Sequence, residues 1–140
     1  MLTQKDLFSL LEQNGIAYEN YEHAPVYTME DLAAQNIPHA GQIVKNLFLR
    51  DDKKRNYYLV TLAGDKAVDL KLLSQNIPSR KLSFANEETL WELLKLEKGH
   101  VTPLGVLNNE QKNVTVVFDT ALIGNKIGVH PLVNTATVFL

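Results

Sequence analysis

The chain has 140 residues, no cysteine and a formal net charge of −2. This length predicts one globular domain over residues 1–140, and the lack of cysteine excludes disulfides and thiolate metal sites. No apolar run approaches the ~20 residues that span a bilayer, and the N-terminus begins with polar residues. We therefore expect a cytoplasmic protein without membrane contact.

Positive charge is concentrated in one third of the chain. Residues 45–81 hold nine lysines and arginines against four acidic residues, a net charge of +5, whereas both flanking segments are net negative. This balance argues against binding to long DNA, because such affinity comes from neutralising many phosphates at once. A few phosphates could still be bound locally. Ordinary solvated charges around a turn at 51–55 are the simpler interpretation.

Capping residues, apolar repeats and chain breaks predict mixed secondary structure. Thr3 and Asp6 form a capping-box pattern, and leucines at helical spacing follow as far as Gly15. Apolar residues on both sides of a charged turn predict a hairpin. In chain order we expect a helix at 3–15, a strand at 16–23, a helix at 28–37, strands at 42–50 and 56–62, a helix at 69–75, a strand at 81–84, a helix at 86–96 and strands at 114–119, 126–129 and 135–140. The sum is a mixed α/β domain with helices outside a largely antiparallel sheet.

Lys45 is an anomaly within the first strand of the predicted hairpin. In IVKNLFL (43–49) it shares a strand face with three apolar residues that must point inward, and a charge there needs a partner or a pocket. One interpretation is an edge lysine that extends its ammonium to water. The other is an ammonium at the floor of a cleft that binds phosphate or carboxylate. Asn46 faces the opposite way in an ideal strand, so the two converge only if the strand bends or bulges.

Two further segments concentrate groups that could bind a ligand. GHVTPLG (99–105) is a shaped loop whose backbone could approach a ligand closely, although it lacks the spacing of known phosphate-binding loops and a plain surface turn is the alternative. In GVHPLVNTATV (128–138), His130 is followed by three hydrogen-bonding side chains, and a structural histidine is the alternative. The four histidines are too scattered to predict a metal site, and no G-x-S-x-G motif supports a serine triad.

Taken together and in this order, IVKNLFL, GHVTPLG and GVHPLVNTATV resemble the YbaK/ProX family of aminoacyl-tRNA editing domains. Within that family they look most like the free-standing prolyl-tRNA editing branch (ProXp-ala or PrdX-like), which hydrolyses Ala-tRNA(Pro). The likeness runs from the first predicted helix to Leu140. It implies a single editing domain with a barrel-like sheet and no cofactor.

The resemblance also implies roles for individual residues. Lys45 matches the signature lysine that holds the 3′-terminal phosphate of the tRNA and the ester, and the 27–34 segment matches a variable helix that covers the pocket. Arg80 is similar to a basic residue expected to touch the acceptor stem. The residues expected to be catalytic are Lys45, Gly99 and His130. Those expected to bind substrate are Tyr27, Asn46, Arg80, Val101, Thr102, Pro103 and Asn134.

The implied reaction needs no nucleophilic side chain. An aminoacyl ester is already activated, and the neighbouring 2′-hydroxyl of the ribose can orient or deprotonate a water, so the protein has only to position the ester and stabilise the oxyanion. Lys45 is then an electrostatic clamp. A pocket that admits alanine and excludes proline by size would correct a synthetase error that differential binding, worth only about 1 to 3 kcal/mol, cannot prevent.

The expected partner is the acceptor end of a tRNA carrying a small amino acid, with prolyl-tRNA synthetase as a second candidate partner. Two other functions stay open. One is a non-catalytic aminoacyl-tRNA or nucleotide-binding regulatory module, which would bind through Lys45 without turnover. The other is an esterase for small amino acid esters, which would be indifferent to Arg80 and to salt, whereas an acceptor-stem reader should weaken as salt rises.

Overall fold

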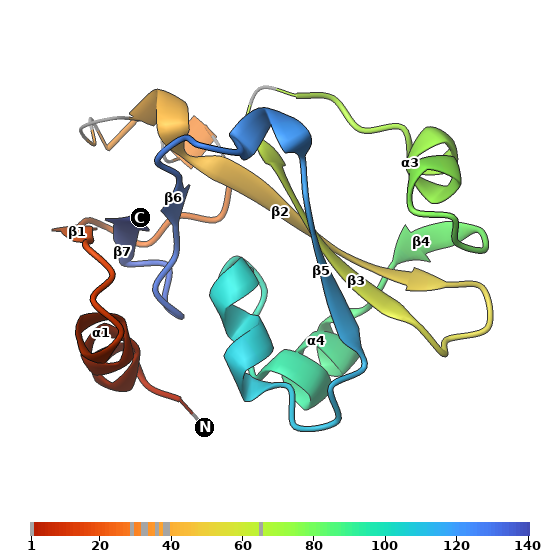
Figure 1. Ribbon diagram of the computed structural model, residues 1–140, viewed down its shortest axis with the longest axis horizontal. Helices are drawn as coiled ribbons and strands as arrows, with labels where there is room; N and C mark the ends of the chain where they lie inside the picture. The colour runs from red at the N-terminus through yellow and green to blue at the C-terminus, as the bar shows by residue number, and fades with distance from the viewer. Residues whose placement is uncertain (1, 29, 32–33, 36, 38–39, 65) are drawn as a thin grey trace.

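The strands that the structure describes form two sheets. The structure, a computed structural model, describes residues 2–28, 30–31, 34–35, 37, 40–64 and 66–140 (Figure 1). A three-stranded sheet has the order β1-β7-β6, and a four-stranded sheet has the order β4-β2-β3-β5. The strands are β1 (Glu19–Glu22), β2 (Val44–Asp51), β3 (Tyr57–Ala63), β4 (Leu82–Phe84), β5 (Val114–Phe118), β6 (Gly128–Val129) and β7 (Ala136–Phe139). Neither sheet closes on itself, so the mixed α/β class is confirmed but the barrel-like arrangement is not.

The helices begin where the capping patterns predict. The α-helices are α1 (Gln4–Gln13), α3 (Leu70–Asn76) and α4 (Glu87–Leu94), and the short 3-10 helices are η1 (Ala40–Gln42), η2 (Pro103–Asn108) and η3 (Thr120–Leu122). Thr3 and Asp6 form the predicted capping box at the start of α1. Of the helix predicted at 28–37, residues 29, 32, 33 and 36 lie outside those the structure describes, and residues 30 and 31 are helical. No described helix is long and apolar enough to cross a membrane.

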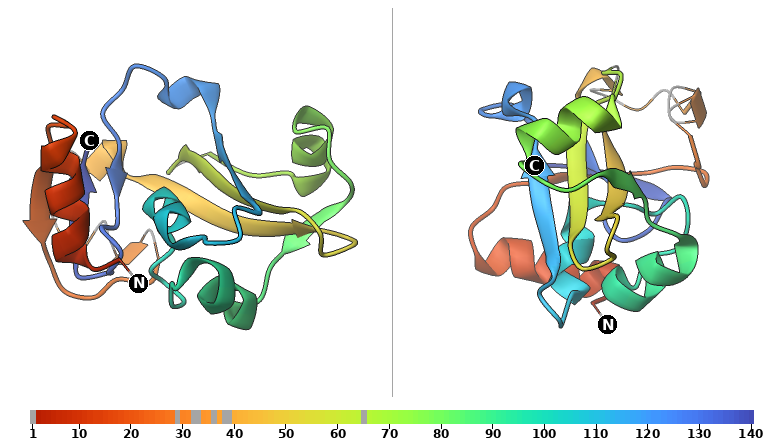
Figure 2. Two further views of the ribbon diagram at one scale, coloured as in Figure 1. Left: turned by 60° about the horizontal axis from the view of Figure 1, so that its bottom comes forward. Right: turned by 90° about the vertical axis from the view of Figure 1, so that its right-hand side faces the viewer.

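The four-stranded sheet is built around the predicted hairpin. Strands β2 and β3 pair antiparallel without interruption from Val44↔Ala63 to Arg50↔Tyr57. Strand β5 joins the far side of β3 in parallel, which the sequence did not predict. Alternate residues of the hairpin face opposite sides, because successive side chains of a strand point to opposite faces. Phe48 and its neighbours pack against α4, and Leu49 and its neighbours pack against α3, so the two helices cover opposite faces (Figure 2).

The two sheets meet at the beginning of β2. A single bridge joins Ile43 to Gly128, just before β2 and at the start of β6. Around it, buried side chains of the two sheets share apolar clusters, including Val44 with Val138 and Ile43 with Phe139. Figure 1 shows the result: β2 starts beside the small sheet and runs away from it to its far end at β4. The two ends of this strand therefore lie in different surroundings.

Candidate functional site

Among the described residues, no strand pairs with one edge of β2 over its first half, and this is the open edge of the strand. Strand β3 covers the other edge throughout, whereas β4 pairs only with Leu49 to Asp51. The peptide N–H of Asp51 donates to the carbonyl of Asn56, on the β3 side, and the carbonyl of Phe48 accepts from the N–H of Ala85, on the β4 side. Because peptide groups alternate in direction along a strand, Asn46 points its own N–H and C=O away from β3, toward the open edge.

A cavity of about 230 Å³ lies at this open edge. Its walls come from five separate stretches of chain: Val26, Tyr27 and Thr28; Ile43, Val44, Lys45 and Asn46; Gly99 and Val101; Gly128, Val129 and His130; and Thr137. Lys45 and Asn46 both line it although they lie on opposite faces of β2. The register is continuous, so no bulge brings them together. They converge because the cavity wraps around the unpaired edge, which side chains of both faces can reach.

Asn46 ties the loop after α4 to the sheet. The hydroxyl of Thr61 on β3 donates to Asn46 Oδ1 at 2.7 Å. This bond fixes the orientation of the amide, so that Asn46 Nδ2 donates to the carbonyl of Val101 at 3.4 Å. Through Asn46, the buried Thr61 therefore helps to hold the loop at Val101 in position on the cavity wall.

Gly99 and Tyr27 meet at the rim of the cavity. Gly99 has φ of +83°, and a Cβ placed on it would lie 2.5 Å from Cδ1 of Tyr27. A glycine is required there for two reasons: the left-handed backbone conformation and the close approach of the aromatic ring. Tyr27 as a whole residue is 65% exposed. It therefore lies over the loop backbone while facing solvent.

His130 is a half-buried residue of the cavity wall, directly after β6. Its Nδ1 lies 3.2 Å from the carbonyl oxygen of Ala136. Burial lowers its pKa below the ordinary value, and the nearby His23 and His100 act in the same direction, while the bond to Ala136 opposes them. The imidazole is therefore neutral near pH 7.

Four of the residues predicted to bind substrate do not line this cavity. Thr102 is fully buried, and its hydroxyl accepts from the Leu104 N–H at the start of η2. Pro103 is the buried first residue of η2. Asn134 donates to the carbonyl of Val26 at 2.9 Å. These three support the segments that form the walls, and a direct role for them in binding stays a prediction.

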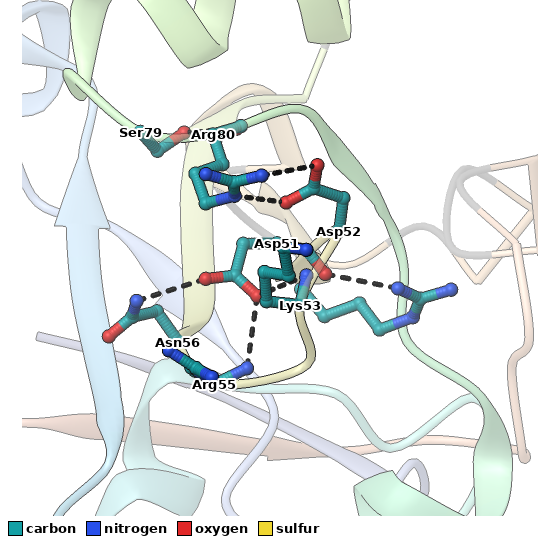
Figure 3. Close-up of polar contacts among 8 residues, drawn as sticks. Asp51, Asp52, Lys53, Arg55, Asn56, Ser79 and Arg80 are labelled. Atoms are coloured by element: carbon teal, nitrogen blue, oxygen red, sulfur yellow. Dashed lines mark hydrogen bonds and ion pairs between the residues drawn. The ribbon is translucent and has the colours of Figure 1, made fainter.

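Arg80, the fourth, lies at the other end of β2. It is paired with Asp52 at the hairpin turn (Figure 3). Lys45 and Asp51 are six residues apart on one strand, which corresponds to about 20 Å at ~3.3 Å per residue. One small ligand could not touch both Arg80 and the cavity. A long one could.

Sequence reasoning missed several cavity residues. Val26 carries no signal of function, because a buried valine is an ordinary core residue. Thr28, Val44, Gly128 and Thr137 lie within the segments that carry the resemblance, but nothing in their residue types alone distinguishes them from their neighbours. The described residues contain no group of three His, Asp or Glu side chains that could hold a metal ion.

Most of this chain matches a known protein family. Residues 23–140 match the profile of a protein family described as aminoacyl-tRNA editing domain. The chain belongs to this family. It is 48% identical to the prolyl-tRNA editing protein ProX of Acetoanaerobium sticklandii, over 100% of this chain and 86% of the relative. The matched segment contains every residue of the cavity wall.

Two more distant proteins match most of this chain. The prolyl-tRNA synthetase associated domain-containing protein 1 of Danio rerio is 34% identical over 96% of this chain and 74% of its own length. The crystal structure of a protein proposed as a trans-editing enzyme for prolyl tRNA synthetase superposes with a TM-score of 0.72 at 21% identity, covering 98% of this chain and 85% of that one. The latter likeness shows the fold alone.

Proposed function

We propose that this editing domain is a trans-acting hydrolase that removes a small amino acid, alanine first of all, from mischarged tRNA(Pro). The observation that carries the proposal is the convergence of Lys45, Asn46, Gly99 and His130 on one cavity at an open strand edge. The family and the names of the relatives, which refer to prolyl-tRNA editing and prolyl-tRNA synthetase, support the same substrate.

The proposed chemistry is attack of water on the ester carbonyl. The bond between that carbon and the ribose 3′-oxygen breaks, the amino acid leaves as its carboxylic acid, and the 3′-oxygen takes a proton that the water gives up. The neighbouring 2′-hydroxyl orients or deprotonates the water, so no nucleophilic side chain is needed.

The residues of the cavity then have electrostatic and positioning roles. The Lys45 ammonium holds the 3′-terminal phosphate and the ester as a compact point charge. The Asn46 peptide N–H at the open edge and the backbone at Gly99 offer dipoles to the oxyanion that develops. The cavity of about 230 Å³ limits the side chain by size, with Val26, Val44 and Val101 as apolar walls.

The test is single-turnover deacylation of Ala-tRNA(Pro), with Pro-tRNA(Pro), Ser-tRNA(Pro) and Cys-tRNA(Pro) in parallel. We expect rapid release of alanine and slow release of proline. Lys45→Ala should lower the alanine rate by about 100-fold or more, as expected for removal of one electrostatic contact to a transition state. Lys54→Ala is the matched control, because it removes the same charge at the exposed hairpin turn.

Two results would contradict this proposal. If all four esters survive at the uncatalysed rate while the tRNA still binds, the domain is a binding module instead of an enzyme. If alanine methyl ester is hydrolysed as efficiently as Ala-tRNA(Pro), the RNA is not the substrate. Association with prolyl-tRNA synthetase is part of the same proposal, and the cytoplasmic location stays a prediction.

A further inference from the structure

A short chain of hydrogen bonds lies directly behind the cavity and has no role in the chemistry above. His23 follows β1, and its Nδ1 lies 2.8 Å from the carbonyl oxygen of Ala24. Its Nε2 lies 2.8 Å from the hydroxyl of Thr137 on β7. Thr137 is only 1% exposed, yet it lines the cavity. These hydrogen bonds therefore connect His23, which does not line the cavity, to Thr137, a residue of the cavity wall.

The partners of His23 determine where the hydrogens lie. A carbonyl oxygen can only accept, so His23 Nδ1 must carry the hydrogen of that bond. In the neutral ring, Nε2 is then an acceptor, and the Thr137 hydroxyl must be the donor. With the His23 ring neutral, the one hydrogen of this hydroxyl is committed to His23. Toward the cavity, Thr137 can therefore only accept a hydrogen bond, through a lone pair of its hydroxyl oxygen.

The same reasoning applies to His130, whose ring lies 6.5 Å from that of His23. Its Nδ1 donates to the Ala136 carbonyl, and burial keeps the ring neutral by lowering its pKa. Its Nε2 is thus an acceptor, and it has no hydrogen-bond partner within the described part of the chain. Thr137 and His130 therefore act as two hydrogen-bond acceptors toward the cavity, because their own hydrogens are donated to other protein groups. Lys45 brings a cation to the same cavity from β2.

We propose that Thr137, oriented by His23, accepts a hydrogen bond from the α-amino group of the aminoacyl ester, and that His130 Nε2 is a second acceptor for the same group. An amino group donates N–H whether or not it is protonated, whereas the ester oxygens and the phosphate only accept. The polarity of the cavity therefore directs the amino group toward Thr137 and the carbonyl oxygen toward Lys45. His23 is a positioning residue that acts through Thr137.

This inference rests on the proposed function for the identity of the ligand, and it adds a requirement that size selection does not impose. A propionyl ester is no larger than an alanyl ester but lacks the amino group. It should fit the cavity and bind poorly, because it leaves two acceptors of the cavity wall without a donor. We expect the loss to be about 10- to 100-fold, the range for a hydrogen bond to a charged group.

The experiment measures binding of two stable amide analogues and so does not depend on turnover. The probes are acceptor-stem microhelices of tRNA(Pro) ending in 3′-amino-3′-deoxyadenosine, acylated with either alanine or propionic acid. The wild type should bind the alanyl analogue at least about tenfold more tightly. Thr137→Val, which keeps the shape and removes the hydroxyl, should abolish most of this preference, and Thr137→Ser should keep it.

His23 and a neighbouring threonine complete the design. His23→Phe should lower the preference as Thr137→Val does, and His23→Gln, whose amide oxygen can accept from the hydroxyl, should restore part of it. Thr135→Val is the control, because its exposed side chain lies on the same segment away from the cavity. It should leave the preference unchanged.

The outcomes separate this inference from the proposed function. Equal wild-type affinity for the two analogues, or a preference that survives in Thr137→Val, overturns the inference even if Ala-tRNA(Pro) is hydrolysed. A preference that Thr137→Val abolishes supports it even if hydrolysis is never observed. Failure of both analogues to bind overturns the inference together with the choice of substrate.

Discussion

Strand β2 begins at the cavity and ends at a charged turn, and the two ends are held in place by different kinds of contact. At the turn, Asp51 accepts hydrogen bonds from groups two, four and five residues further along (Figure 3). At the cavity, five stretches of chain, the first and last more than a hundred residues apart, contribute one wall each. A local network can stabilise its own segment with little help from the rest of the fold. A wall built from distant segments depends on how both sheets pack.

The turn illustrates how a buried charge is satisfied locally. Asp51 is 1% exposed, and its carboxylate accepts from the N–H groups of Lys53 and Arg55 and from the side chain of Asn56. Burial alone would raise its pKa, but these hydrogen bonds together hold the pKa below the ordinary value. The basic side chains of the turn are left in solvent.

After Lys45→Ala, the largest effect expected from disturbing the cavity end alone is that of Gly99→Ala. The new methyl group meets the Tyr27 ring and also sits on a left-handed backbone, so the Tyr27 ring, the loop at Gly99 or both must shift. We expect the single-turnover rate on Ala-tRNA(Pro) to fall by about 100-fold, the usual consequence of misplacing a catalytic group by about 1 Å.

Gly124→Ala is the matched control for this prediction. Gly124 has φ of +80°, and a Cβ added there would have nothing within 4 Å, so the variant carries the same backbone strain without the contact. This variant should be less stable than the wild type but should hydrolyse Ala-tRNA(Pro) at the same single-turnover rate. Removal of the ring in Gly99→Ala/Tyr27→Ala should recover part of the activity, and a rate for Gly99→Ala equal to that of Gly124→Ala would contradict the role given to the rim.

Asp51→Ala disturbs the turn end of β2, where we expect a loss of stability and little change in activity. It leaves the N–H groups of Lys53 and Arg55 without their acceptor, and we expect the free energy of unfolding to fall by about 2 kcal/mol. The rate of the folded protein on Ala-tRNA(Pro) should stay within a few-fold, because the cavity lies at the other end of β2. Asp52→Ala, which removes an exposed carboxylate of the Arg80 pair, should cost clearly less.

The stabilisation by Asp51 should also depend on pH in one direction. Since its pKa is lower in the folded state, the unfolded chain takes up the proton first as the pH falls. The stability difference between wild type and Asp51→Ala should be complete above the ordinary aspartate pKa of about 3.9 and disappear as the pH falls through the folded value. Urea unfolding at several pH values measures this. A difference that grows in acid would refute the assignment.

The smallest expected effect is that of Arg80→Ala, which asks whether both ends of β2 serve one substrate. If the acceptor stem extends from the cavity toward the turn, the variant should bind tRNA a few-fold more weakly, with an unchanged rate at saturation. The salt dependence of log K should flatten by about one phosphate contact. Equal affinity and equal salt dependence would confine the substrate to the cavity.

The sequence predicted the locally determined elements well. The capping box at Thr3 and the hairpin on both sides of the turn at 51–55 are confirmed, because their signals lie within a few residues of one another. The expected strand at 126–129 is only two residues long, and η2 occupies the second half of the expected loop at 99–105. In both places the outcome depends on partners far along the chain.

Residue types and their order determined which chemistry this protein could perform. A lysine on an inward strand face, a glycine loop and a histidine within a polar motif are recognisable from the amino-acid sequence alone. Only the tertiary structure decided that Lys45 and Asn46 share one cavity, that Arg80 does not, and that His23 orients Thr137. The physical reason is that a side chain's type sets what it can donate, accept or repel, whereas an unpaired strand edge and its neighbours exist only once both sheets have packed.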